Sequence, residues 1–198
     1  MDFCELEGKR VILKPLELRH AEPLFHCSRS NKLWEKLPLQ IETLAEMKQF
    51  IETAIKGRES EEEFPYVVID KLTNRVVGTT RYLRISRLHN NLNIGWTWYS
   101  EEVWRTKVNT EAKFLLLQQA FELWKATRVE IITTTDHLRS QKAIERIGAT
   151  KEGILRKKYN NKDYVFYSII DDEWLAVKNR LAILLKQQVE GGCGNETQ

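Results

Sequence analysis

The middle of the chain constrains the fold most, because it holds three strand-like segments in close succession. The segments cover residues 64–70, 76–85 and 92–99, and a turn at residues 71–75 and a polar link at residues 86–90 separate them. The short turn predicts that the first two segments form a β-hairpin. The third is expected to lie beside them, so the sequence indicates a β-sheet at the centre of the protein.

Helical and strand-like patterns alternate on both sides of this unit. Further strands are expected at residues 10–16, 129–134, 150–155 and 163–169, and helices at residues 17–30, 43–56, 109–126, 138–147 and 171–186. This order, β-αα-βββ-α-β-α-ββ-α, predicts an α/β (α+β) fold in which helices flank a mixed, mostly antiparallel central sheet. We expect one domain over residues 1–187 and a disordered tail at residues 188–198.

Composition excludes several other classes of protein. The 198 residues are 42% hydrophobic and 30% charged, which is typical of an ordinary globular domain. No apolar run approaches the roughly 20 residues of a membrane span, and the N-terminus does not resemble a secretory signal. A net charge of +3 without a dense basic stripe argues against nucleic acid as a partner.

The cysteines indicate the compartment. Cys4, Cys27 and Cys193 are odd in number, far apart and without metal-ligand spacing. They suit reduced thiols, so we expect a cytoplasmic protein with no metal site.

Residues 95–113 predict a strand, a loop rich in hydrogen-bond donors, and a helix start. A helix start offers unpaired backbone N–H groups and the positive end of the helix dipole, so this loop could bind a pyrophosphate. Arg105 and Lys107 would add charge-assisted contacts. A solvated helix start with Asn109 as its N-cap explains the same pattern, and the residues alone leave both interpretations open.

Several separated segments together resemble the GNAT acetyltransferase superfamily. They are Gly95-Trp96-Thr97-Trp98, Trp104–Lys113, Arg139–Ala149, Val77–Leu83 and Ala149–Leu155. They are most similar to the branch that includes the ribosomal-protein N-terminal acetyltransferases, and the resemblance covers roughly residues 10–181. It implies direct transfer of an acetyl group from acetyl-CoA to a primary amine of a protein N-terminus or a small molecule. A homodimer is also compatible with this family.

The resemblance implies a position for acetyl-CoA. In this family the strands corresponding to residues 92–99 and 129–134 splay apart and form the acetyl-CoA cleft. Pantetheine would lie along Trp96, Thr97 and Trp98, of which Trp96 and Trp98 share one face of the strand. The pyrophosphate would lie against the following loop and helix start, formed by Arg105, Thr106, Lys107, Val108, Asn109 and Thr110.

Two residues are candidates for catalysis. Ser140 matches a family serine near the CoA sulfur, where it could protonate the departing thiolate; the alternative is an ordinary helix serine that binds backbone N–H groups. His137 stands where the family usually has asparagine. It is either a catalytic or a structural histidine.

Other positions depart from the family pattern. Asn93 stands where the family often has a glutamate base, and an amide cannot take a proton at neutral pH. Lys107 and Asn109 stand at positions that are usually small in the phosphate loop. The departures at Asn93, His137 and Lys107 support a second hypothesis, a CoA-binding or ligand-sensing module with impaired catalysis.

Overall fold

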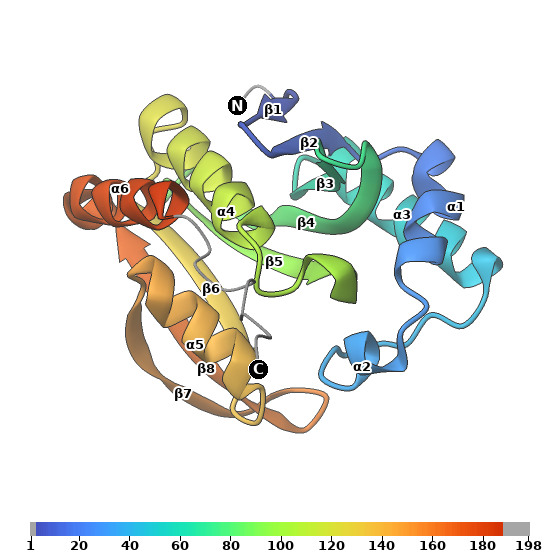
Figure 1. Ribbon diagram of the computed structural model, residues 1–198. Helices are drawn as coiled ribbons and strands as arrows, with labels where there is room; N and C mark the ends of the chain where they lie inside the picture. Colours follow the sequence, from blue (N-terminus) through green and yellow to red (C-terminus); the bar gives the residue numbers. More distant parts are fainter. Residues whose placement is uncertain (1–2, 188–198) are drawn as a thin grey trace, which may run out of the picture.

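The computed structural model describes residues 3–187, and the tail expected at residues 188–198 lies outside them. One sheet of eight strands has the order β1-β2-β3-β4-β5-β6-β8-β7 (Figure 1). The strands are β1 (Leu6–Glu7), β2 (Val11–Pro15), β3 (Glu63–Asp70), β4 (Arg75–Ser86), β5 (Asn91–Tyr99), β6 (Arg128–Thr134), β7 (Thr150–Tyr159) and β8 (Lys162–Ile170). All neighbouring strands are antiparallel except β5 and β6, which confirms the predicted mixed sheet.

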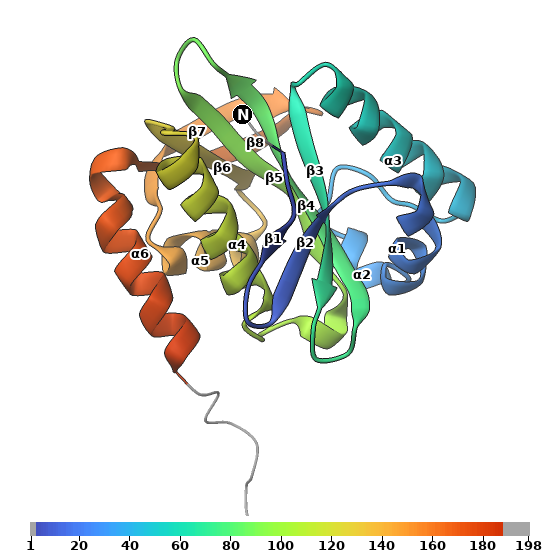
Figure 2. The same ribbon diagram turned by 90° about the horizontal axis from the view of Figure 1, so that it is seen from above.

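Helices cover both faces of the sheet. They are α1 (Ala21–Cys27), α2 (Asn31–Trp34), α3 (Leu44–Glu59), α4 (Val108–Gln118), α5 (Leu138–Ile147) and α6 (Asp171–Lys186). Figure 2 shows α1 and α3 on one side of the sheet and α4 and α6 on the other. Within the described residues, no helix is both long and apolar enough to cross a membrane.

The sheet separates two apolar clusters because neighbouring residues of a strand point to opposite faces. In β3, Tyr66 and Val68 pack in the cluster under α4, α5 and α6. Val67, between them, packs in the cluster under α1, α2 and α3. Both faces of the central strands are therefore buried, and the sheet is a rigid support for the residues along its edges.

Strands β5 and β6 diverge. Their parallel pairing comprises only Asn91 with Arg128, Leu92 with Val129, and Asn93 with Glu130. Beyond these pairs, β5 continues to Tyr99 and β6 to Thr134 without pairing with each other (Figure 1). The splay expected from the family resemblance is therefore present.

The predicted elements differ from the observed ones in the helices. The helix expected at residues 17–30 is a 3-10 turn (Leu18–His20) followed by α1, and the four-residue helix α2 comes next. The helix expected at residues 109–126 ends as α-helix at Gln118 and continues as a π-helical segment, Gln119–Leu123. The apolar spacing of residues 120–124 does not distinguish these two helical forms, because a π-turn shifts the register by one residue.

Strand β1 was not predicted, because a strand of two residues leaves no periodic pattern. A tertiary contact holds the turn between β1 and β2 in place. The buried carboxylate of Glu111, in the first turn of α4, accepts hydrogen bonds from the backbone N–H groups of Lys9, Arg10 and Val11 at 3.0, 2.7 and 2.7 Å. This contact fixes the start of α4 relative to the first strands of the sheet.

Candidate functional site

A β-bulge distorts β5 just beyond the point where it leaves β6. Arg81 of β4 pairs with Gly95, but the next pair joins Thr79 with Trp98, so β5 has one extra residue there. Trp96 lies in this bulge with a φ of 47°, a left-handed conformation that is a genuine outlier for so bulky a residue. Because β6 has diverged, the edge of β5 at the bulge is available for pairing with an extended ligand.

The bulge keeps the predicted facing of the two tryptophans. The ring of Trp96 lies 6.1 Å from that of Phe50 on α3, and the ring of Trp98 lies 5.6 Å from that of Trp34 on α2. Both indoles therefore point to the face that α2 and α3 cover. Thr97 points to the opposite face, toward α4.

A buried lysine lies against Thr97 and was not assigned any role from the sequence. The Lys113 ammonium donates a hydrogen bond of 3.0 Å to the Thr97 hydroxyl, which lies 2.7 Å from the hydroxyl of Thr80. Lys113 is 5% exposed, and no carboxylate among residues 3–187 forms an ion pair with it. Burial lowers its pKa to about 7. Its place directly after Ala112, within an apolar helix face, was the available signal.

The loop before α4 leaves the helix start without a side-chain cap. The N-cap residue is Lys107, not Asn109, and its side chain forms no capping hydrogen bond. Only the Thr106 hydroxyl approaches the first turn, at 3.4 Å from the Val108 nitrogen. The alternative interpretation, a helix capped by Asn109, is therefore wrong, and backbone donors remain at this end of α4.

The basic side chains of the loop have different environments. Lys107 donates to the backbone carbonyl of Leu185, near the end of α6, at 2.7 Å, so a phosphate contact would require it to leave that carbonyl. Arg105 is exposed and has a φ of 62°. Thr110 accepts a hydrogen bond from Arg146 of α5 at 3.0 Å. Arg105 is thus the side chain of the loop that is best placed to meet an anion from solvent.

The start of α5 contacts this loop. The guanidinium carbon of Arg139 lies 3.8 Å from the centroid of the Trp104 ring, and the Trp104 indole N–H donates to the carbonyl of Tyr99 at 2.8 Å. Ser140 follows Arg139 in the first turn of α5. The structure therefore brings the predicted catalytic serine close to the predicted phosphate loop, although the two are far apart in sequence.

Ser140 and His137 differ in how the structure constrains them. Within residues 3–187 the Ser140 hydroxyl forms no hydrogen bond, so the alternative of a serine bound to its own backbone is not observed. His137 is the N-cap residue of α5, and burial lowers its pKa, so the imidazole is neutral at pH 7. Its neighbour Asp136 pairs with Lys36 at 2.8 Å.

A carboxylate lies where β5 and β6 diverge. Glu130 of β6 is the cross-strand neighbour of Asn93, the last residue of β5 that pairs with β6. The Glu130 carboxylate accepts a hydrogen bond from Arg128 at 2.9 Å. The resemblance implies a glutamate on β5, where this chain has the amide Asn93. The acid, Glu130, lies on the neighbouring strand β6. Strand alternation in residues 129–134 was the signal that could have indicated Glu130.

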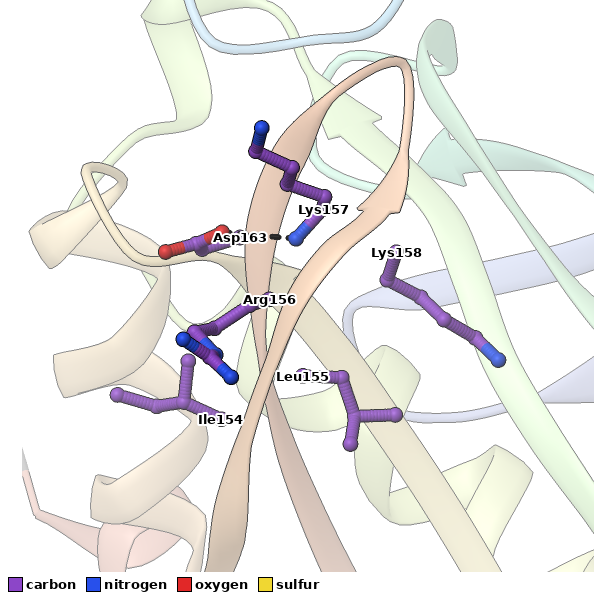
Figure 3. Close-up of a pocket in the computed structure, with 6 residues that line it drawn as sticks. All are labelled: Ile154, Leu155, Arg156, Lys157, Lys158 and Asp163. Carbon is purple, nitrogen blue, oxygen red and sulfur yellow. Dashed lines mark hydrogen bonds between the residues drawn. The ribbon is translucent and has the colours of Figure 1, made fainter.

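The pocket shown in Figure 3 is separate from the site described above. It measures about 750 Å³ and lies along the edge strand β7, which β8 separates from β6. Its lining is Ile154, Leu155, Arg156, Lys157, Lys158 and Asp163. None of these residues belongs to the diverging strands or to the start of α4.

Comparison with known proteins identifies the class. The chain is 24% identical over 173 residues to the Bacillus subtilis protein YoaA, named an uncharacterized N-acetyltransferase, covering 85% of this chain and 97% of that protein. A GCN5-related N-acetyltransferase from Brucella melitensis has a similar structure, with 28% identity and a TM-score of 0.87 over 93% of this chain and 86% of that one.

Two solved structures with lower identity share the fold. A Vibrio cholerae protein provisionally assigned as a ribosomal-protein-serine acetyltransferase has 22% identity and a TM-score of 0.73 over 84% of this chain and 97% of its own. The microcin C7 self-immunity acetyltransferase MccE, solved with acetyl-CoA and AMP, has 22% identity and a TM-score of 0.73 over 82% and 93%.

The fold and these relatives define an N-acetyltransferase. Residues 10–150 match the family model for the acetyltransferase (GNAT) domain. The chain belongs to the GNAT acetyltransferase family, which confirms the predicted family.

Proposed function

We propose that this protein transfers an acetyl group from acetyl-CoA directly to a primary amine of a small molecule or a protein N-terminus. One observation carries the proposal: β5 leaves β6 after Asn93, and the bulged segment of β5, unpaired with β6, contacts α4, the helix that follows the loop, through Thr97 and Lys113. An extended pantetheine arm would pair with the backbone of Trp96, Thr97 and Trp98.

The donors at the start of α4 fit the pyrophosphate of CoA. Apart from the 3.4 Å hydrogen bond from Val108 to the Thr106 hydroxyl, no side chain of the described residues caps the first-turn N–H groups, and the helix dipole favours an anion there. The residues proposed to contact it are Arg105, Thr106, Lys107, Val108, Asn109 and Thr110. The acetyl-CoA bound to MccE supports the same donor for this chain.

The chain's own residues suggest how the protons move. When the amine nitrogen attacks the carbonyl carbon, the C–S bond breaks, the nitrogen loses one proton and the sulfur gains one. Ser140, whose hydroxyl has no partner in the described residues, is the proposed donor to the sulfur. His137 is the proposed base, because its lowered pKa leaves the imidazole free to accept a proton. Asn93 is excluded from that role because an amide is not basic.

Calorimetric titration with acetyl-CoA, followed by an assay of CoA thiol release against a panel of amines and peptides, tests the proposal. Saturable binding with turnover of one acceptor class is expected. Leu88→Ala, at an exposed position outside the site, is the control variant and should bind and react like the unchanged protein. No binding at millimolar acetyl-CoA would contradict the proposal. Binding without turnover of any acceptor would favour the second hypothesis, a sensing module, which the absence of a carboxylate at Asn93 motivates.

The proposal extends to the compartment and the oligomeric state. The reduced-thiol pattern of the cysteines supports the cytoplasm, where acetyl-CoA is made and used. A homodimer is the assembly that the family resemblance supports. Fractionation of cells and light scattering of the purified protein test these two points.

A further inference from the structure

Arg81 is a buried guanidinium beside the bulge. Its side chain is 4% exposed, and its backbone pairs with Gly95 of β5. Its Nη1 donates to Glu63 at 2.7 Å. The guanidinium carbon lies 4.8 Å from the ring centroid of Phe50 and 5.4 Å from that of Trp96, so two aromatic rings flank it.

Two of its nitrogens have no partner. Within the described part of the chain, Nε and Nη2 of Arg81 are buried and form no hydrogen bond. These two nitrogens lie on the same edge of the guanidinium and form a fork that binds both oxygens of one carboxylate. Leaving such donors buried and unpaired costs free energy, so the arrangement suits a ligand that supplies the missing oxygens.

The same chain shows this fork when it is filled. Nε and Nη2 of Arg10 donate to the two carboxylate oxygens of Asp70 at 3.3 and 3.1 Å. Arg10 and Arg81 thus present the same pair of nitrogens in two states. The chain supplies the carboxylate to Arg10, and it supplies none to the fork of Arg81.

A second buried donor lies on the same face. Asn93 is 5% exposed, and its Nδ2 also has no partner among residues 3–187. It pairs with Leu83, two residues from Arg81, so strand alternation places Asn93 and Arg81 on one face of the sheet. Both unpartnered groups donate, which favours an oxygen-rich ligand group over a cationic one.

We propose that the acetyl acceptor carries a carboxylate that binds to the Nε and Nη2 of Arg81. This inference rests on the proposed function, because it takes the bulge at Trp96 as the place of acetyl transfer. Arg81 is directly opposite Gly95, one strand spacing of about 5 Å away. This adjacency favours an acceptor in which few bonds separate the carboxylate from the reacting amine. The acceptor class is an amino acid or a similar small zwitterion, not a peptide N-terminus whose carboxyl group is an amide.

The charges at the site agree with this class. Glu63 neutralises Arg81 only in part, because the Glu63 side chain is 25% exposed and water screens it, whereas Arg81 is buried. A carboxylate would fill the fork with two charge-assisted hydrogen bonds. The rings of Phe50 and Trp96 lie beside the guanidinium, and its buried Nε–Nη2 edge has no partner among the described residues, so a ligand carboxylate has to enter this buried site to reach it.

Nuclear magnetic resonance of the arginine Nε–H groups tests the fork without requiring turnover. The protein, labelled with ¹⁵N-arginine, is titrated with N-acetylglycine and separately with N-acetylglycinamide at equal ionic strength. A saturable shift of the Arg81 signal with the carboxylate and none with the amide is expected. Arg81→Lys and Arg10→Lys assign the two signals, and the Arg10 signal should not move. No saturable shift with N-acetylglycine, or equal shifts with both compounds, would overturn the proposal.

Kinetics give an independent readout. Free amino acids should be acetylated with a kcat/KM at least about tenfold above that of their amides. Arg81→Lys, which keeps the charge but loses the fork, should raise the KM of the acids and remove most of this preference, whereas Arg10→Lys should preserve it. Amides that react as well as the acids would overturn the inference. If acetyl-CoA neither binds nor reacts, the proposed function fails, and the resonance titration still decides whether Arg81 binds carboxylates.

Discussion

Lys113 of α4 donates a hydrogen bond of 3.0 Å to the hydroxyl of Thr97 on β5, and burial is the only cause that lowers its pKa to about 7. A buried ammonium without a counterion is costly, so the burial of Lys113 reduces the stability of the fold, and the hydrogen bond to Thr97 offsets only part of that cost. This contact lies directly beside the bulge at Trp96, on the face opposite Arg81.

Lys113→Met is expected to stabilise the protein most at low pH. Below pH 7, Lys113 is protonated in both the folded and unfolded states, and the folded state bears the full cost of burial. Between pH 7 and 10.5 the unfolded state binds more protons, so the stability of the wild-type protein rises with pH. The advantage of the variant should therefore decrease by roughly 3 kcal/mol between pH 6 and pH 9.5.

Urea denaturation at both pH values measures this difference. Lys142→Met, at an exposed position on α5, is the matched control and should show no such dependence. An advantage of Lys113→Met that is the same at the two pH values would contradict a lysine with a lowered pKa.

Ser140→Ala is expected to lower kcat by about 100-fold with little change in KM. The reason is that the hydroxyl would protonate the sulfur in the transition state only, and the structure gives it no bond that holds the fold together. Steady-state kinetics with a turned-over acceptor measures the effect, and Ser60→Ala, at the end of α3, is the control. A kcat within twofold of the wild type would remove Ser140 from the mechanism.

Arg105→Gln is expected to weaken acetyl-CoA binding by about fivefold, because an exposed arginine contributes a modest, salt-dependent attraction to phosphate. Calorimetry at low and high salt measures it. The difference between variant and wild type should shrink in high salt. Arg75→Gln, an exposed change at the first residue of β4, is the control. Equal affinities at low salt would show that Arg105 does not contact the donor.

Glu111→Gln is expected to destabilise the protein by about 2 kcal/mol. The carboxylate accepts three backbone N–H groups at 3.0, 2.7 and 2.7 Å, and an amide would replace one acceptor oxygen by a donor that faces them. Equilibrium unfolding in urea measures the loss, with the exposed Glu52→Gln of α3 as reference. A loss of unfolding free energy as small as that of the Glu52→Gln reference would mean that another contact holds the turn between β1 and β2.

Much of the fold could be predicted because its patterns are local. The hairpin of β3 and β4, the amphipathic α6 and the left-handed cap at Gly148 follow from periodicity and turn residues within short windows. The ends of α1 and the π-helical end of α4 could not be predicted in this way. They depend on which carbonyl each N–H finds after packing, as the bond from Ala126 to Ala120 shows.

The candidate site could likewise be predicted only in part from local sequence patterns. The motif from Trp104 to Lys113 was recognisable from residue types, and the loop from 104 to 107 does lie at the start of a helix. The roles of single side chains were less predictable. Lys107 binds the carbonyl of Leu185, 78 residues away, and no local pattern indicates that partner.

The sequence by itself determined most of the order of the elements and the family, because these depend on neighbours in the chain and on motifs of residue types. The tertiary structure decided which charges are paired. Glu111 reaches a backbone 102 residues away, Lys113 meets Thr97 without a counterion, and Arg81 keeps two buried nitrogens free. Pairing depends on distances and burial that exist only after the helices have packed on the sheet, so the chemistry of the acceptor is visible only there.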